Sequence, residues 1–175
     1  IFILTLNTNG SFLWAKVIGG SGYLDTFGNL HDAVSHGYSI TSNTNGDILV
    51  TGSFLGSIDF DPGATNYMLS ATNTPHIFIL KLNANGSFVW AKKFGNNKYG
   101  DEAYAIKTDS NNHIYVVGVF YDSLDADPNT GNYWLCSDST QGGFILCLTS
   151  QGDFLWANKL SGNMLNHVCI ASCIS

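Results

Sequence analysis

The fold is decided by the segment FILTLNTNGSFLWA at positions 2–15, which recurs as FILKLNANGSFVWA at 78–91 and as FILCLTSQGDFLWA at 144–157. Trp14, Trp90 and Trp156 mark the same place in each copy, with separations of 76 residues (14 to 90) and 66 residues (90 to 156). A repeat of this kind decides the architecture, because each unit must bury its apolar face against the next one. The sequence therefore predicts a single repeat region over residues 1–175.

Each copy reads as a β-hairpin, because apolar residues alternate on both sides of a polar turn. In the first copy Phe2, Leu4 and Leu6 fall on one face, and the pair Asn9-Gly10 is expected to supply the positive φ angles of the turn. A second type of hairpin precedes the later copies, at 38–54 and again at 104–120. The repeat unit is thus two hairpins joined by a segment that contains Asp-x-Asp-Pro.

Four antiparallel strands per unit, with short turns and no helical periodicity, are typical of a β-propeller blade. We therefore expect an all-β fold built from such blades. The expected divisions are a half blade (1–18), two blades (38–94 and 104–160) and the first strand of a further blade (166–175). The longer first interval is explained by residues 19–37, a Gly-rich stretch without periodicity that predicts a long loop with an insertion.

Composition and charge exclude several classes of partner. The net charge of −6 argues against nucleic acid, which needs clustered Lys and Arg. No apolar run approaches the roughly 18 residues of a membrane span, so membrane insertion is not expected, and the chain contains no recognisable signal peptide. Charged residues are only 11% of the chain, which predicts a surface of neutral polar groups, as in many extracellular β proteins.

Three co-linear motifs resemble the bacterial SBBP-type β-propeller repeat proteins. They are the segment around Phe78 to Lys92, the strand Gly46 to Phe54, and the Asp-Pro segment Ser57 to Gly63. The resemblance covers nearly the whole chain and implies blades of a secreted or cell-surface protein, with no shared enzymatic activity or catalytic residues. The third copy departs from the pattern at Cys147, Asn158 and Asn129, where the second copy has Lys81, Lys92 and Gly63.

The number of units is small for a propeller, which typically closes with four to eight blades. Two whole units with a half unit before them predict either a fragment of a longer repeat protein or a ring closed by self-association. Neighbouring blades or further copies of the chain are therefore expected partners.

The recurring carboxylates are the only candidate metal ligands. Asp59 and Asp61, and again Asp125 and Asp127, lie two residues apart on extended chain and so point to the same side. Such a pair could contribute oxygen ligands to Ca²⁺, although neither site has the spacing of a complete calcium loop. The alternative, which we favour, is a structural turn in which Asp caps backbone amides before a proline. No other cofactor is expected.

Other reactive residues give no catalytic pattern. Asp101-Glu102 is interpreted as a solvated loop, because neighbouring strand residues face opposite ways. The three repeat tryptophans are interpreted as core residues between blades rather than as sugar platforms. The five histidines are dispersed, which favours surface or loop-packing roles. Cys136 and Cys147 are either a disulfide or free thiols, whereas Cys169 and Cys173 on one strand lie too far apart to pair.

The favoured function is a non-enzymatic module that serves as scaffold or binding surface, contacting protein or glycan through 19–37 and the Asp-x-Asp-Pro loops. A Ca²⁺- or carbohydrate-binding propeller is the alternative. A hydrolase or lyase propeller is the third. That third class needs ionisable residues at matching inner-strand positions, and we expect none here.

Overall fold

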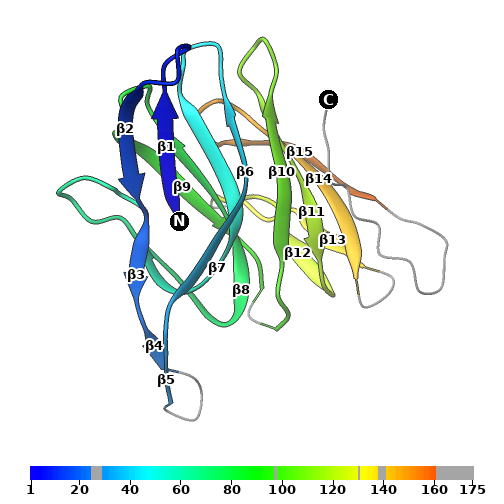
Figure 1. Cartoon of the computed structure of the whole chain (residues 1–175). Helices are drawn as coiled ribbons and strands as arrows, with labels where there is room; N and C mark the ends of the chain where they lie inside the picture. Colours follow the sequence, from blue (N-terminus) through cyan, green and yellow to red (C-terminus); the bar gives the residue numbers. More distant parts are fainter. Residues whose placement is uncertain (25–28, 97, 130, 138–140, 161–175) are drawn as a thin grey trace.

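The computed structural model describes residues 1–24, 29–96, 98–129, 131–137 and 141–160. These residues form antiparallel β-sheets joined by turns and loops, none of the sheets is closed, and no helix occurs among them (Figure 1). The predicted all-β fold is thus confirmed. Within the same ranges, no helix is long and apolar enough to cross a bilayer.

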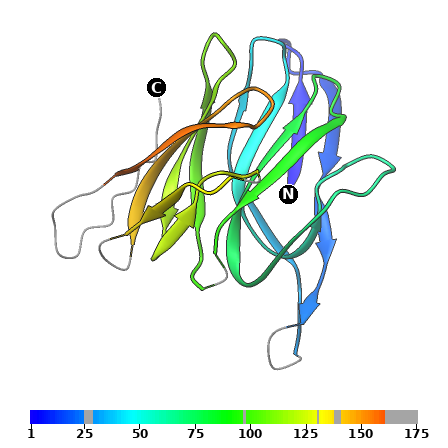
Figure 2. The ribbon, with the colours of Figure 1, turned by 180° about the vertical axis from the view of Figure 1, so that it is seen from behind.

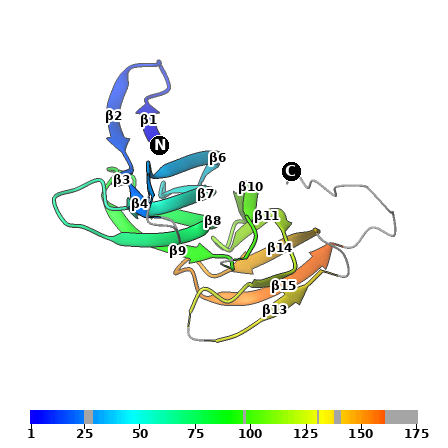
Figure 3. The same ribbon diagram turned by 90° about the horizontal axis from the view of Figure 1, so that it is seen from below.

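Two sheets each contain four main strands in the order in which the chain forms them, and the first also has a short fifth strand. The main strands of the first sheet are β6 (Val34–Ser42), β7 (Ile48–Asp59), β8 (Met68–Leu82) and β9 (Phe88–Phe94). The second consists of β10 (Glu102–Thr108), β11 (Ile114–Phe120), β14 (Gly142–Leu148) and β15 (Phe154–Leu160). The hairpin of β1 (Phe2–Leu6) and β2 (Phe12–Val17) precedes them, and Figure 3 shows these three parts following one another across the molecule.

Short strands extend this framework at its edges. β3 (Gly19–Ser21) pairs with the end of β7, and β4 (Tyr23–Leu24) pairs with β5 (Leu30–His31) in a hairpin that projects at the lower end of Figure 1. β12 (Ser123–Asp125) and β13 (Trp134–Cys136) pair in the second unit as the ends of β7 and β8 do in the first, because Asp125 faces Trp134 and Asp59 faces Met68. The irregular extensions therefore repeat as well as the main strands.

The predicted long loop over 19–37 is wrong in part. Three short strands lie within it, and β6 begins at Val34 rather than at 38, so its first residues pair with β7 as far as Leu55. The start of this strand could not be predicted because Ser35, His36 and Gly37 interrupt the apolar alternation. Their backbone nevertheless pairs with β7. Residues 166–175, predicted as a further strand, lie outside the described residues.

Two apolar cores lie between successive units. Alternation along β8 sends Ile77 and Ile79 into the core shared with the second four-stranded sheet, whereas Phe78, Leu80 and Leu82 enter the core shared with the first hairpin. Both faces of this strand are thus buried. A strand buried on both faces is expected where sheets stack on one another.

Two of the repeat tryptophans, Trp14 and Trp90, pack against the turn of the following unit. A side chain on Gly86 would approach the ring of Trp14, and one on Gly152 would approach the ring of Trp90, each at 3.1–3.3 Å. The indole Nε1 of Trp14 also donates to the carbonyl of Ala84 at 3.1 Å. These contacts agree with the predicted role between units for Trp14 and Trp90, whereas Trp156, predicted as a core residue as well, is 38% exposed. The absence of a side chain at the turn glycine leaves room for the indole.

The turns are held by the side chain of their first residue. In the turn after β8, Oδ1 of Asn83 accepts the amides of Asn85 and Ser87 at 2.9 and 3.0 Å. In each of the other four turns a side-chain oxygen of the first residue likewise accepts hydrogen bonds from two backbone amides of the turn. These first residues are Asn7, Asn43, Asp109 and Thr149. The fourth residue has positive φ, +76° at Gly86 and +78° at Gly10, so the glycine of the Asn-Gly pair supplies the positive φ that the sequence predicted. The turn is a type I turn followed by a left-handed residue.

Replacing Asn83 by Ala should lower the free energy of unfolding by about 1 kcal/mol, because two backbone amides lose their acceptor. Urea denaturation of the purified chain measures this loss. Asn85→Ala is the matched control, since Asn85 is an exposed asparagine of the same turn. Equal destabilisation by the two substitutions would show that the Asn83 side chain does not hold the turn.

Candidate functional site

The first predicted metal site is a turn closed by its own carboxylates. Oδ1 of Asp59 accepts the amides of Asp61 and Tyr67 at 3.0 and 2.9 Å. Oδ1 of Asp61 accepts the amide of Gly63 at 2.7 Å, and its other oxygen contacts the hydroxyl of Thr65. The loop that carries them, between β7 and β8, projects from the side of the molecule in Figures 1 and 2. Asp61 also lines a hollow of about 350 Å³ there, together with Lys16 of the first hairpin.

The second predicted metal site repeats this arrangement. Oδ1 of Asp125 accepts the amides of Asp127 and Tyr133 at 3.2 and 2.9 Å, and Oδ1 of Asp127 accepts the amide of Asn129 at 2.9 Å. In both loops the carboxylates do what the structural-turn interpretation requires. Among the described residues no three His, Cys, Asp or Glu side chains gather as a metal site, and Ca²⁺ binding stays a prediction.

A different region brings polar and aromatic side chains together, at the junction where β6 and β10 lie side by side. The amide of Ile106 donates to Oγ of Ser39 at 3.2 Å, and Oγ1 of Thr108 donates to the carbonyl of Ser42 at 3.2 Å. Farther along, Oδ1 of Asn112 accepts from both the amide and the hydroxyl of Thr44. The partners are 66 to 68 residues apart, so equivalent strands of successive units meet along this line.

Two equivalent β-bulges aim tyrosines into this junction. Tyr38 is the extra residue of β6 between positions paired with Gly52 and Thr51, and Tyr104 is the extra residue of β10 between positions paired with Gly118 and Val117. A Cβ on Gly52 or Gly118 would clash with the carbonyl oxygen of the facing strand. Glycine therefore permits the close approach, and the bulge redirects the side chain, as bulges beside functional sites commonly do.

Glu102 joins the two tyrosines. Its Oε1 accepts the hydroxyl of Tyr38 at 3.3 Å, and its Oε2 accepts the hydroxyl of Tyr104 at 2.5 Å. The two rings are 5.6 Å apart, and the ring of His36 stacks on Tyr38 at 6.0 Å. Burial, followed by the hydrogen bond to Glu102, raises the pKa of Tyr104. The phenol thus remains protonated and continues to donate to the carboxylate.

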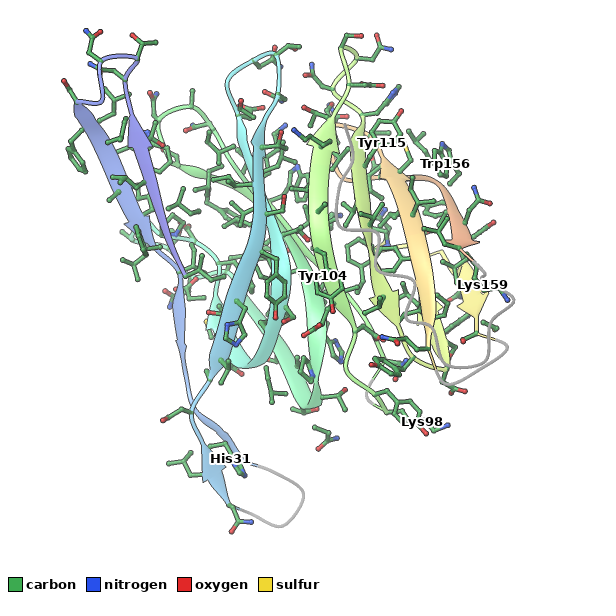
Figure 4. All side chains as sticks on the ribbon, turned by 45° about the vertical axis from the view of Figure 1, so that its right-hand side comes forward. His31, Lys98, Tyr104, Tyr115, Trp156 and Lys159 are labelled. Atoms are coloured by element: carbon green, nitrogen blue, oxygen red, sulfur yellow. The ribbon has the colours of Figure 1, made fainter. Side chains whose placement is uncertain are left out.

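A pocket of about 340 Å³ opens beside this carboxylate. Its walls are Tyr99, Gly100, Glu102 and Tyr121, and the two tyrosine rings are 6.3 Å apart with a tilt of 37°. The ammonium of Lys98 lies 5.1 Å from the centroid of the Tyr99 ring and 3.2 Å from Oδ2 of Asp122. In Figure 4 Tyr104 lies where β10 meets the preceding sheet, and Lys98 lies below it at the end of the second sheet, away from His31 on its projecting hairpin.

Asp101 is not the solvated loop residue predicted from the sequence. Its side chain is fully buried, Oδ1 accepts the amide of Tyr121 at 3.0 Å, and Oδ2 accepts the amide of Asn96 at 3.1 Å. Burial raises its pKa to about 7, against the lowering effect of these two hydrogen bonds. Asp101 and Glu102 do have separate partners, as their opposite directions predicted. Asp101 therefore fixes the strand connection beneath the pocket, while Glu102 faces the tyrosines.

Ionisable and phenolic residues recur at matching positions on the first main strands of the two sheets, whereas the sequence analysis expected no such match on inner strands. His36 and Glu102 occupy equivalent places on β6 and β10, and so do Tyr38 and Tyr104. The signal was present in the sequence as tyrosines and glycines repeated at the same interval, Tyr38 with Tyr104 and Gly52 with Gly118. It was missed because a bulge cannot be located from alternation alone.

The remaining candidates do not gather at the junction or at either loop. Cys136 is exposed and Cys147 is buried, and both are free thiols, while Cys169 and Cys173 lie outside the described residues. His113 contacts Asp109 at 2.9 Å within its own turn, and His76 is buried in β8. The start of the 19–37 segment reaches the first Asp-x-Asp-Pro loop, because Gly19 pairs with Asp59, but the second loop belongs to the next sheet.

Gly118→Ala should lower the free energy of unfolding by about 1–3 kcal/mol, because the new methyl group overlaps the carbonyl oxygen of Glu102. Gly19→Ala is the control, since a Cβ there meets nothing within 4 Å. Urea denaturation of both variants makes the comparison. A Gly118→Ala chain as stable as the control would mean that the bulge does not need glycine.

The buried carboxyl of Asp101 should make stability depend on pH. The pKa of Asp101 is about 7 in the folded chain and near 3.8 in the unfolded chain, so the folded chain binds this proton more tightly. The stabilisation that protonation gives to the folded chain is therefore complete below pH 3.8 and is lost as the pH rises to about 7. The difference in unfolding free energy between the wild type and Asp101→Asn should therefore fall from pH 5 to pH 7, by at most about 1.4 kcal/mol per pH unit. All other ionisable groups are the same in both proteins, so their contributions cancel in this difference. A constant difference would contradict the raised pKa.

Comparison with known proteins does not extend this description. No protein-family model matches the chain, and no curated protein matches its sequence significantly. The resemblance to SBBP-type repeats therefore remains a prediction that rests on the three motifs in the sequence.

Proposed function

We propose that this chain is a β-propeller repeat module that serves as a binding surface, without catalysis, in a secreted or cell-surface protein. The observation that carries the proposal is the junction of β6 and β10, where equivalent strands of successive units meet at a constant interval and present equivalent bulge tyrosines. Four-stranded antiparallel sheets that stack with their first strands together are typical of propeller blades.

The arrangement of carboxyl groups favours binding over catalysis. A general acid at neutral pH needs a raised pKa and access to the substrate. Asp101 has the raised pKa, but its side chain is fully buried and both of its oxygens accept backbone amides. Glu102 is accessible, but both of its oxygens are engaged by phenols that hold it as an acceptor. The junction is thus better suited to recognising a ligand than to transferring protons.

The cellular location is proposed from two properties of the sequence. Only 11% of the residues are charged, so the surface depends on neutral polar groups, and the repeat motifs resemble those of secreted and surface proteins. Ligands available at a cell surface, such as glycans and exposed proteins, are therefore the first to test.

Biolayer interferometry with the whole chain immobilised should detect binding to purified cell-surface polysaccharide or glycoprotein, with no product released from chromogenic glycosides or esters. Tyr38→Ala combined with Tyr104→Ala should weaken this binding at least about tenfold, as loss of buried aromatic contacts does at interfaces. Tyr133→Ala is the control, because Tyr133 is as exposed as Tyr38 and lies in the second Asp-x-Asp-Pro loop.

Two outcomes would contradict the proposal. Turnover of a chromogenic substrate that Glu102→Gln abolishes would make the junction an active site. Binding that the double tyrosine variant leaves unchanged, while thermal melting shows all variants folded, would move the binding surface away from β6 and β10.

A further inference from the structure

We propose that the pocket of Tyr99, Gly100, Glu102 and Tyr121 binds a neutral, hydroxylated ring, namely one or two sugar units of a glycan. This inference rests on the proposed binding function and names its ligand class. The pocket lies next to the bulge tyrosines, because Glu102 both lines it and accepts their hydroxyl groups.

The aromatic walls supply the stacking surface that a sugar ring needs. Tyr99 is 44% exposed, and its ring contacts that of Tyr121 at a centroid distance of 6.3 Å and a tilt of 37°, so the two rings together form one aromatic wall of the pocket. The hydroxyl of Tyr121 accepts Nε2 of Gln141 at 3.0 Å, which fixes the orientation of this ring. A tyrosine has an apolar ring face and a polar hydroxyl group. It can therefore stack on the apolar face of a sugar ring while its hydroxyl group reaches the hydroxyls at the edge of the sugar.

The carboxylate of Glu102 supplies the polar contact. Each of its oxygens already accepts one phenol and retains a further lone pair, so it can accept a ligand hydroxyl without moving. Hydrogen bonds to an ionised acceptor are stronger than bonds between neutral groups. A carboxylate held in place by two phenols also loses little side-chain freedom when the ligand arrives.

The charges around the pocket favour a neutral ligand. Glu102 repels an anion. The ammonium of Lys98, which is paired with Asp122, lies 5.1 Å from the Tyr99 ring and already uses the electrostatic attraction of that ring for a cation. A sugar without charged substituents is not repelled by Glu102 and does not compete with Lys98 for the ring. The volume of about 340 Å³ lies at the lower end of small-molecule sites, which suits one or two sugar units rather than a long chain.

The test is isothermal titration of the whole chain with neutral di- and trisaccharides of glucose, mannose, galactose and xylose, beside oligosaccharides of a uronic acid and of glucosamine. At least one neutral sugar should bind more tightly than both charged ones. Tyr99→Ala and Tyr121→Ala should each weaken that binding about tenfold, which corresponds to the loss of one stacking contact. Tyr121→Phe keeps the ring and should retain most of the affinity, and Glu102→Gln should weaken binding by removing the charge.

Tyr133→Ala serves as the matched control, because its 41% exposure is close to that of Tyr99 and it lies in another loop. If none of the neutral sugars binds at millimolar concentration, the proposed ligand class is wrong. If a surface protein still binds through Tyr38 and Tyr104 in that case, the proposed function stands. Sugar binding unchanged in Tyr99→Ala and Tyr121→Ala would overturn the pocket alone. Stronger binding of glucosamine or uronic acid oligosaccharides would overturn the argument from charge.

Discussion

The close approach of two backbones at Gly52 and Gly118 is the constraint on which the candidate site depends. At each of these glycines the carbonyl oxygen of the facing strand occupies the space of a side chain. This approach allows the bulges that turn Tyr38 and Tyr104 toward one another, and Glu102 then connects the two phenols. Because both bulges belong to the first strand of a unit, the repeat itself doubles the feature and places the copies side by side. A site of this kind needs no special loop, only a repeated irregularity in neighbouring strands.

A second constraint acts at the turns, where a side-chain oxygen substitutes for backbone pairing. Asn83, Asp109 and Thr149 differ in chemistry, but each presents an oxygen to two amides of its own turn. The left-handed position that follows tolerates Asn112 in one turn and glycine in the others, as expected for a conformation that asparagine adopts more readily than other residues. The repeats can therefore drift in sequence, as the third copy does, without a change in turn geometry.

The sequence predicted the main strands well because their signal is local. Alternation and turn residues locate the hairpins from Phe2, Phe78 and Phe144, and the structure has strands at all three places. The candidate site was not predicted, because its features depend on contacts between distant residues. From the sequence alone Asp101 is predicted to be exposed, whereas in the structure its carboxylate is buried and accepts hydrogen bonds from the amides of Tyr121 and Asn96. Likewise, the bulge at Tyr104 is visible only once β10 is paired with β11.

Burial in this fold depends on the neighbouring unit more than on the residue itself. Phe78, Leu80 and Leu82 on β8 are fully buried, whereas their counterparts Phe2, Leu4 and Leu6 on β1 are 72%, 48% and 48% exposed. The residues are identical in both hairpins, but those of β8 pack in one core with Ile3 and Ile18 of the preceding hairpin, and among the described residues no such unit covers the matching face of β1. The same three residues are thus buried or exposed according to whether another unit packs against their face of the sheet. The stability of each hairpin is therefore largely a property of the interface between units, as in other repeat proteins.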